Sequence, residues 1–160
     1  MEIADALEFV REQHNAVMLT YRRDGSAQLS PIACDVASTA AGDRIVISTR
    51  ETALKVKNLR RDPRVSLCVL AENFYGSWIQ VDGTAEIVSL PDALELLVDY
   101  YRGLRGEHPD WDEYRAAMVA DQRCIVRITV ERAGPDISGW PADDGGRRGV
   151  RLRAGESPRW

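Results

Sequence analysis

The sequence predicts an α+β domain, mainly β, whose antiparallel strands close into a complete or split barrel. Short apolar stretches follow one another along the chain and are separated by tight turns, which is the pattern of antiparallel hairpins. The regular alternation of strands and helices that builds a parallel sheet is absent, as are the glycine-rich phosphate motifs of nucleotide-binding α/β proteins. The 160 residues are enough for one domain with its own core.

The N-terminal part provides a helix and a hairpin. Residues 3–13 repeat apolar side chains at helical spacing, which predicts an amphipathic helix. Residues 17–21 and 28–35 are predicted strands, joined by an Asp-Gly turn at 23–26 that supplies the positive φ angles of a hairpin. Pro31 lies inside the second strand and has no N–H to donate, so it predicts an edge position or a bulge.

Three further strands surround a basic segment. Residues 44–48 and 64–70 are predicted strands before and after this segment, which spans residues 48–64. Residues 77–89 predict a long strand, and Asp82-Gly83 within it predicts a bulge.

Proline opens two predicted helices in the second half. Pro91 and Pro109 each take the first helical position, where no N–H is needed. Residues at helical spacing follow in both: Leu94, Leu97, Val98 and Tyr101, then Trp111, Tyr114, Ala117 and Met118. Residues 123–130 alternate and predict the last strand. Beyond them the periodicity disappears, so residues 1–134 are predicted to form the domain and residues 135–160 a flexible tail.

Composition narrows the function. A net charge of -4 argues against a general nucleic-acid binder, so an anion site must be a local basic cluster. The three cysteines are far apart and show no metal-ligand spacing, which is typical of small core residues in a reducing compartment. Without a signal peptide or a long apolar run, the expected location is the cytoplasm, and no membrane partner is expected.

Residues 48–64 carry the clearest local signal. They contain Lys55 and Lys57, the only lysines of the chain, together with several arginines. Thr52 is predicted to cap a helix here, with Leu54 and Leu59 facing inward. A helix N-terminus beside hydroxyls and a lysine is suited to phosphate. On spacing alone, a solvated surface helix explains the segment slightly better than a phosphate site does.

Other candidate residues give weaker signals. His14 and His108 have no neighbouring Cys, Asp or Glu at ligand spacing, so a metal site is not predicted. The order of the residues gives no support for a nucleophilic triad. Trp78 stands between polar side chains and close to Gly76, and it is either a barrel-packing aromatic or a wall against a planar ring.

Four segments, taken together, resemble a known family: DGSAQLSP, IVISTRETALKVKNLRRDPRVSLCV, WIQVDGTAEIV and DWDEYRAAMV. In this order they resemble the pyridoxamine 5'-phosphate oxidase-like split-barrel flavoproteins. The last segment and NLRRDPR are similar to the actinobacterial branch that binds the deazaflavin coenzyme F420. The resemblance covers about residues 3–134 and implies an FMN-binding split barrel that forms a homodimer, with two cofactor sites at the interface.

The resemblance also implies which residues line each site. The phosphate-binding lysine of the family falls on Lys55, and the anionic coenzyme would also meet Lys57, Arg60 and Arg61. The other implied cofactor-lining positions are Ser48 and Thr49, then Gln28, Ser30 and Pro31 beside the ring, and Ser77, Trp78 and Gln80 from the other subunit.

The sequence differs from that of the oxidase at two places, and these differences argue against pyridoxamine phosphate as the substrate. The oxidase carries Ser-Arg-Lys where this chain has Ala53, Leu54 and Lys55, and its C-terminal arginine motif for the vitamin substrate has no counterpart. The resemblance therefore implies an oxidoreductase that transfers hydride between reduced F420 and a small organic acceptor rather than a pyridoxamine phosphate oxidase. An FMN-dependent enzyme of the same fold and a non-catalytic protein that binds a flavin, a deazaflavin or another ligand stay open as alternatives, and no catalytic side chain is assigned.

Overall fold

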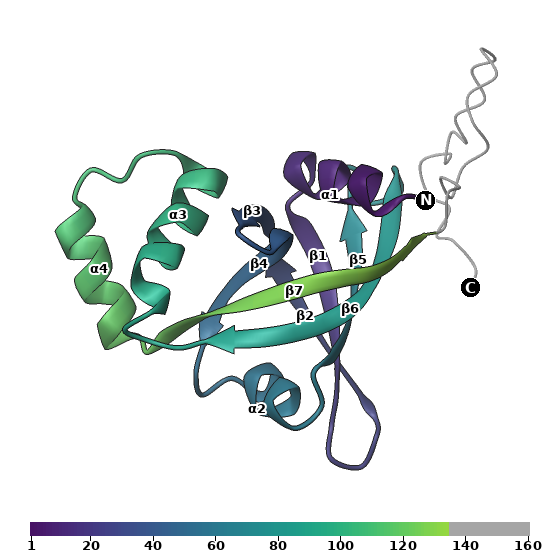
Figure 1. The fold of residues 1–160 in the computed structure, drawn as a ribbon, viewed down its shortest axis with the longest axis horizontal. Coiled ribbons are helices and arrows are strands. Elements are labelled where there is room, and N and C mark those ends of the chain that lie inside the picture. Colours follow the sequence, from purple (N-terminus) through teal and green to yellow (C-terminus); the bar gives the residue numbers. More distant parts are fainter. Residues whose placement is uncertain (135–160) are drawn as a thin grey trace, which may run out of the picture.

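Seven antiparallel strands form one sheet in the order β2-β1-β5-β6-β7-β4-β3 in the computed structural model, which describes residues 1–134 (Figure 1). The strands are β1 (Asn15–Tyr21), β2 (Ala27–Ala33), β3 (Asp35–Thr39), β4 (Gly42–Arg50), β5 (Arg64–Leu70), β6 (Trp78–Val88) and β7 (Arg123–Gly134). The helices of the described part are α1 (Ile3–Glu12), α2 (Leu54–Arg61), α3 (Ala93–Arg105) and α4 (Trp111–Ala120). The predicted antiparallel α+β architecture is confirmed.

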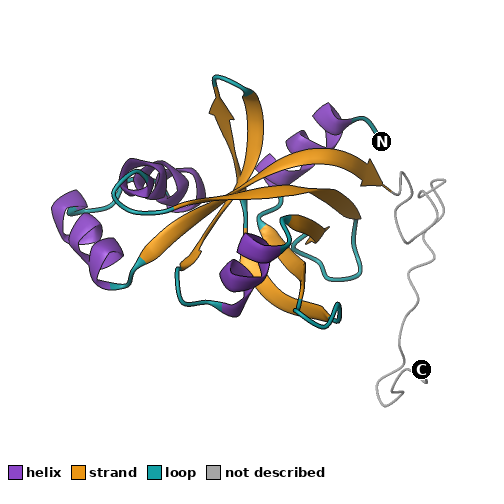
Figure 2. Cartoon of the chain, turned by 60° about the horizontal axis from the view of Figure 1, so that its bottom comes forward, coloured by secondary structure: helices purple, strands orange, loops and turns teal. Residues whose placement is uncertain are grey.

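The sheet curls until its two halves face each other, as Figure 2 shows from a second direction. The edge strand β2 approaches β4, which lies near the other end of the strand order. Side chains inside the curl form the main core, which includes Met18, Ile47, Leu67, Val81 and Val126. Strands β1 and β5 alternate buried and half-buried residues, so each has one face in the core, as a barrel strand requires.

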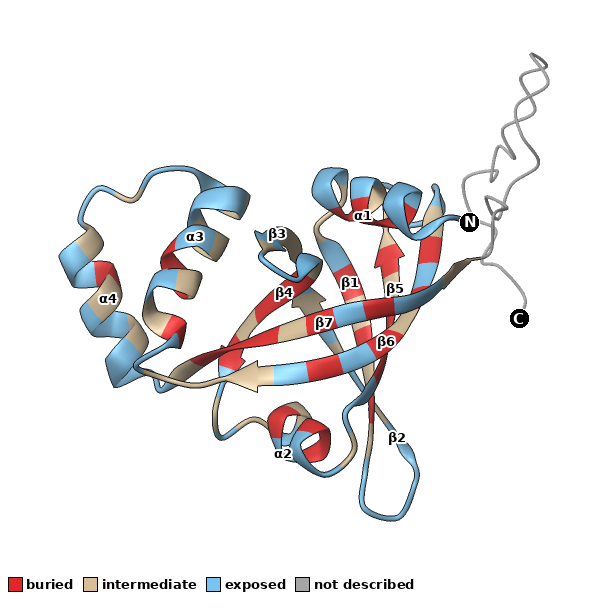
Figure 3. Ribbon diagram, in the orientation of Figure 1, coloured by how far each residue is buried: buried red, intermediate tan, exposed pale blue. Residues whose placement is uncertain are grey.

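The helices cover different parts of this sheet. Helix α1 packs against β3, β4 and β7, whereas α2 lies against β1 and β6 at the bottom of the view in Figure 1. Helices α3 and α4 form a pair at the side of the barrel, around a second, smaller cluster that includes Leu97, Val98, Tyr114 and Ile125. Figure 3 shows buried residues on the side of α2 toward the sheet, and the buried residues of α3 belong to the cluster shared with α4 and the sheet.

Two sequence features have the predicted structural effect. Pro31 lies on β2, an edge strand that pairs only with β1 among the described strands. The pairing of β6 with β7 shifts register between Asp82 and Gly83, which confirms the predicted bulge. A Cβ atom at Gly83 would lie 2.1 Å from the carbonyl oxygen of Thr129, so only glycine lets the two backbones approach this closely.

The predicted element boundaries need three corrections. Helices α3 and α4 begin at Ala93 and Trp111, two residues after the prolines that were expected to open them. In α4 the cap is the side chain of Asp110, which accepts from two backbone N–H groups of the first turn. Strand β3, residues 35–39, was not predicted, because its half-exposed alternation is weak.

Three other expectations concern the chain as a whole. The tail predicted for residues 135–160 lies outside the described residues. No helix in the described part is long and apolar enough to cross a membrane. Cys34, Cys68 and Cys124 are all free thiols, and burial raises the pKa of Cys34 to about 12, so this thiol stays protonated and behaves as a core residue.

Candidate functional site

Helix α2 turns a mixed apolar and polar face toward the barrel. Val56 and Leu59 are buried, and so is Asn58, with 1% of its surface exposed. Two predictions about this helix were wrong. Leu54 is 50% exposed because it stands at the outer side of the first turn. The N-cap is Ala53 rather than Thr52, and no side chain caps the helix.

Lys55 lies on the side of α2 that borders the barrel. It precedes Asn58 by three residues and Leu59 by four, so the three side chains share one helical face. Its side chain is half-buried, and this burial lowers the pKa of its ammonium group. Within residues 1–134 no carboxylate forms an ion pair with Lys55. Lys55 is therefore a partly desolvated cation without a counter-charge among residues 1–134.

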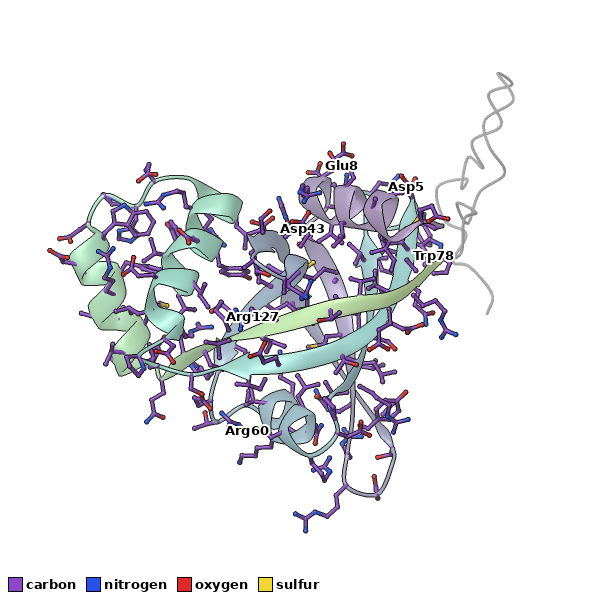
Figure 4. All side chains as sticks on the ribbon, viewed as in Figure 1. Asp5, Glu8, Asp43, Arg60, Trp78 and Arg127 are labelled. Atoms are coloured by element: carbon purple, nitrogen blue, oxygen red, sulfur yellow. The ribbon has the colours of Figure 1, made fainter. Side chains whose placement is uncertain are left out.

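The other basic residues of the segment have different environments. Lys57 is exposed. Arg60 donates to the carboxylate of Glu51 at 2.6 Å and to the hydroxyl of Ser89 at 3.2 Å, and Figure 4 shows its side chain on α2. Arg61 donates to the carbonyl oxygen of Tyr21 at 2.6 Å. Arg60 is thus paired with a carboxylate, whereas Arg61 is held by hydrogen bonds to neutral oxygens.

The end of β4 leads directly into this helix. Thr49 is buried and Ser48 is half-buried. The hydroxyl of Tyr100, on α3, donates to the carbonyl oxygen of Ala33 at 2.9 Å. Burial raises the pKa of Tyr100 to about 12, and a hydrogen bond with the Ser48 backbone partly opposes this effect. Tyr100 therefore joins the end of β2 to β4 beside the predicted cofactor positions.

Strand β2 presents its polar residues toward the inside of the curl. Ser30 pairs in register with buried Met18, and its Oγ is buried without a hydrogen-bond partner among the described atoms. The carboxamide of Gln28 accepts from Thr20 Oγ1 at 3.0 Å. Pro31 follows Ser30 and so points to the opposite face of the strand. Gln28 and Ser30 share the face that borders the core, and Pro31 does not.

Ser77, Trp78 and Gln80 lie far from α2 within one chain. Strand β6 pairs Thr84 with Arg64, three residues after α2, whereas Trp78 lies at the opposite end of the strand. Figure 4 shows Trp78 and Arg60 at opposite sides of the sheet. A single chain brings together β2, the end of β4 and α2, but not the start of β6.

The chain also matches a known protein family. Residues 3–135 match the family model described as pyridoxamine 5'-phosphate oxidase. The chain belongs to the pyridoxamine 5'-phosphate oxidase family. This family consists of flavin-binding oxidoreductases, and the resemblance found in the sequence is confirmed.

Solved structures of family-like proteins share the fold. A conserved hypothetical protein from Mycobacterium tuberculosis is 28% identical, with a TM-score of 0.64 over 83% of this chain and 82% of that one. A protein named as an F420 reductase is 17% identical, with a TM-score of 0.61 over 79% of this chain and 94% of that one. A FAD-binding protein from Mesorhizobium loti is also 17% identical, with a TM-score of 0.53 over 83% and 92% of the two chains. These low identities establish the fold rather than the cofactor.

The groups at α2 and β2 fit the phosphorylated, ring-bearing cofactors of this family. A half-buried ammonium without a counter-charge gains from a phosphate, because a charge-assisted hydrogen bond offsets its desolvation. The buried hydroxyl of Ser30 can donate to an acceptor on a ligand, which would relieve its unpaired state. No group of metal-ligating side chains occurs within the described residues.

Sequence reasoning missed the polar residues that support this region. Thr20 and Asn58 are buried with 0% and 1% exposure, yet they stand in apolar patterns on β1 and α2. Sequence reasoning could have found Asn58, because it stands on the inward side of the predicted helix, where an amide side chain needs a hydrogen-bond partner. Thr20 gave no such signal, because threonine is an ordinary strand residue.

Proposed function

We propose that the protein is an oxidoreductase that binds coenzyme F420 and transfers hydride between the reduced coenzyme and a small organic acceptor. The observation that carries the proposal is Lys55, a half-buried cation without an ion-pair partner in the described part of the chain. Membership of a flavin-binding oxidoreductase family supports a phosphorylated cofactor at this point. The likeness to a protein named as an F420 reductase favours the deazaflavin.

The residues of the chain hold and orient such a cofactor. Lys55 would bind its phosphate, and Lys57 would attract the anionic tail from an exposed position. Ser48 and Thr49 would line the site from β4, and Gln28 and Ser30 would meet the ring from β2. When bound, the deazaflavin supplies two-electron hydride chemistry, and the protein supplies position and electrostatics.

A second candidate is an FMN- or FAD-dependent enzyme with the same site. The likeness to a FAD-binding protein favours it, and Lys55 would bind a flavin phosphate equally well. The difference lies in the ring, because position 5 of a flavin is a nitrogen that accepts hydrogen bonds, whereas in a deazaflavin it is a carbon.

We further propose that the working protein is a homodimer. The outward faces of β1 and β5 carry half-buried Val17, Leu19 and Cys68, and on the neighbouring edge strand Leu29 is 62% exposed. An apolar sheet face with an open edge is suited to pairing with a second copy. Such a pairing can bring Trp78 and Gln80 of one copy toward α2 of the other.

Binding and single-turnover measurements test the proposed activity. Calorimetric titrations with F420, FMN and FAD should show tightest binding of F420, and rapid mixing of the reduced complex with quinones, tetrapyrroles or nitro compounds should reoxidise it. Binding of FMN or FAD more tightly than F420 would refute the F420 proposal and support the flavin-dependent enzyme. Tight binding without reoxidation by any acceptor would indicate a carrier, and no binding of any of the three would refute a cofactor site at Lys55.

A further inference from the structure

Four side chains form a continuous hydrogen-bonded relay between α2 and β2. Arg61 Nη2 donates to Asn58 Oδ1 at 3.1 Å, and Asn58 Nδ2 donates to Thr20 Oγ1 at 3.1 Å. Thr20 Oγ1 donates to Gln28 Oε1 at 3.0 Å. Gln28 Nε2 then donates to the backbone carbonyl oxygen of Leu29 at 3.0 Å. The relay thus connects the helix that carries Lys55 to the strand that carries Gln28 and Ser30.

The direction of the relay is fixed from both ends. A guanidinium group can only donate, so Asn58 must turn its oxygen toward Arg61 and its nitrogen toward Thr20. At the other end a carbonyl oxygen can only accept, so Gln28 must turn its nitrogen toward Leu29. The hydroxyl of Thr20 accepts on one side and donates on the other, which satisfies both constraints. Only one arrangement of the two amides is compatible with all four hydrogen bonds.

Burial makes this arrangement strict. Thr20 and Asn58 are two of only three buried polar residues in the described chain, the third being Thr49. If the Asn58 amide turned over, its nitrogen would face the Arg61 donors, and if the half-buried Gln28 amide turned over, its oxygen would face the carbonyl oxygen of Leu29. Either change loses hydrogen bonds around the buried Thr20 and Asn58, and an unpaired buried polar group costs free energy. The relay therefore holds the Gln28 carboxamide in one orientation before any ligand arrives.

We propose that Asn58 and Thr20 are positioning residues that present Gln28 as a hydrogen-bond donor to an acceptor atom on the cofactor ring. Gln28 Oε1 is engaged by Thr20, and Nε2 has two hydrogens, of which Leu29 takes one. The remaining N–H of this half-buried side chain is available to a carbonyl oxygen or ring nitrogen. The inference rests on the proposed function, because it assumes that the ring lies against β2.

The relay lies between the proposed phosphate-binding side chain and the proposed ring-binding side chain. Lys55 lies one turn before Asn58 on the same face of α2, and Gln28 lies beyond Thr20. The phosphate group and the ring acceptor therefore meet side chains that are joined through two buried residues.

A double-mutant cycle between Thr20 and Gln28 tests the inference. Thr20→Val keeps the shape of the side chain but removes the hydroxyl, and Gln28→Met removes the amide. Each single variant should bind F420 or FMN roughly tenfold or more weakly by calorimetry, the size expected for one lost hydrogen bond. The double variant should bind no more weakly than Gln28→Met alone, because Thr20 acts only through Gln28. Thr20→Ser restores the hydroxyl and should restore binding.

A measurement on the wild-type protein covers the case in which Thr20→Val does not fold. Of the two Gln28 side-chain amide protons in the ligand-free protein, the one donated to Leu29 should exchange with solvent more slowly than the other, as measured by NMR. Addition of cofactor should shift one of the two. Two Gln28 amide protons that exchange with solvent equally fast, or that do not respond to cofactor, would overturn the inference.

The outcomes separate failure of the relay from failure of the proposed function. Additive effects of Thr20→Val and Gln28→Met would overturn the positioning role. Wild-type binding by both variants, with weak binding by Lys55→Ala, would overturn the relay and leave the cofactor site standing. Wild-type binding by Lys55→Ala as well would refute the proposed function itself.

Discussion

Arg60 and Glu51 form an ion pair of 2.6 Å, and this pair divides the basic residues of α2 into two groups. Glu51 also accepts a short hydrogen bond from Ser89, so Arg60 belongs to a local network that fastens α2 to the chain after β6. Lys55 has no equivalent carboxylate in the described part of the protein. The residue that is free to bind an anion is therefore the lysine rather than the arginine.

The first prediction follows from this division. Lys55→Ala should weaken F420 or FMN binding roughly 10- to 150-fold, because it removes a charge-assisted hydrogen bond worth about 1.5–3 kcal/mol. Calorimetric titration measures the change. Arg60→Ala and Lys57→Ala are matched controls on the same helix, and both should weaken binding less. If Lys55→Ala binds as tightly as wild type, α2 is only a surface helix.

The second prediction concerns the pH dependence of folding. Burial lowers the pKa of Lys55 from the ordinary value of 10.5, so between the two values the unfolded chain binds more protons than the folded one. The contribution of Lys55 to the free energy of unfolding therefore rises with pH between its lowered pKa in the folded protein and 10.5. Ligand-free wild type should be less stable than Lys55→Met at neutral pH, and the difference should shrink as the pH approaches 10.5.

Chemical denaturation of both proteins between neutral pH and pH 10.5 measures this difference, and all other titrating groups cancel in the comparison. Saturation with the phosphorylated cofactor should reverse the order at neutral pH, because the ligand gives the ammonium group a partner. A difference that stays constant with pH would mean that Lys55 is not desolvated in the folded protein.

The third prediction concerns the bulge of β6. Gly83→Ala would place a Cβ atom 2.1 Å from the carbonyl oxygen of Thr129 and 3.1 Å from Ile128. Because backbone must move to accept it, the substitution should lower the free energy of unfolding by about 1–3 kcal/mol, measured by denaturation. Gly134→Ala is the control, since its Cβ meets no described atom within 4 Å. Equal stability of the two variants would contradict the observed register shift.

The sequence predicted the strands where an apolar pattern or a turn constrains the backbone strongly. Pro31 indicated the edge strand and Asp82-Gly83 the bulge, because each residue type excludes most alternatives. Leu54 was misplaced because a leucine in the first turn of a short helix can reach past the barrel into solvent. For such a residue, tertiary position outweighs hydrophobicity.

The supporting part of the site was less predictable for a physical reason. Lys55 stood out because lysine is rare in this chain. By contrast, the relay from Arg61 to Gln28 depends on which side chains of three separate elements meet in space. A buried threonine or asparagine carries no periodic signature, so its role becomes visible only when its partners are placed. The difference between Lys55 and Arg60 likewise becomes visible only in the structure, because it depends on Glu51 lying next to Arg60.

The last prediction concerns assembly. Light scattering during gel filtration should show that wild type is a dimer, because its outward sheet face is apolar and Leu29 on the edge strand is 62% exposed. Leu29→Asp should raise the dissociation constant of the dimer at least about tenfold, since a buried leucine contributes about 1.5–3 kcal/mol. Val119→Asp is the matched control, because Val119 is 54% exposed on α4, away from that face.

Cofactor affinity should fall together with dimerisation in Leu29→Asp and stay unchanged in Val119→Asp. The reason is the separation within one chain: α2 ends three residues before Arg64, which pairs with Thr84 of β6, and Trp78 lies toward the opposite end of β6. A complete site that includes Trp78 then needs a second copy. A wild-type monomer that binds cofactor at full affinity would refute both the dimer and the assignment of Trp78 to the site, and would confine the cofactor to the groups around Lys55 and Gln28.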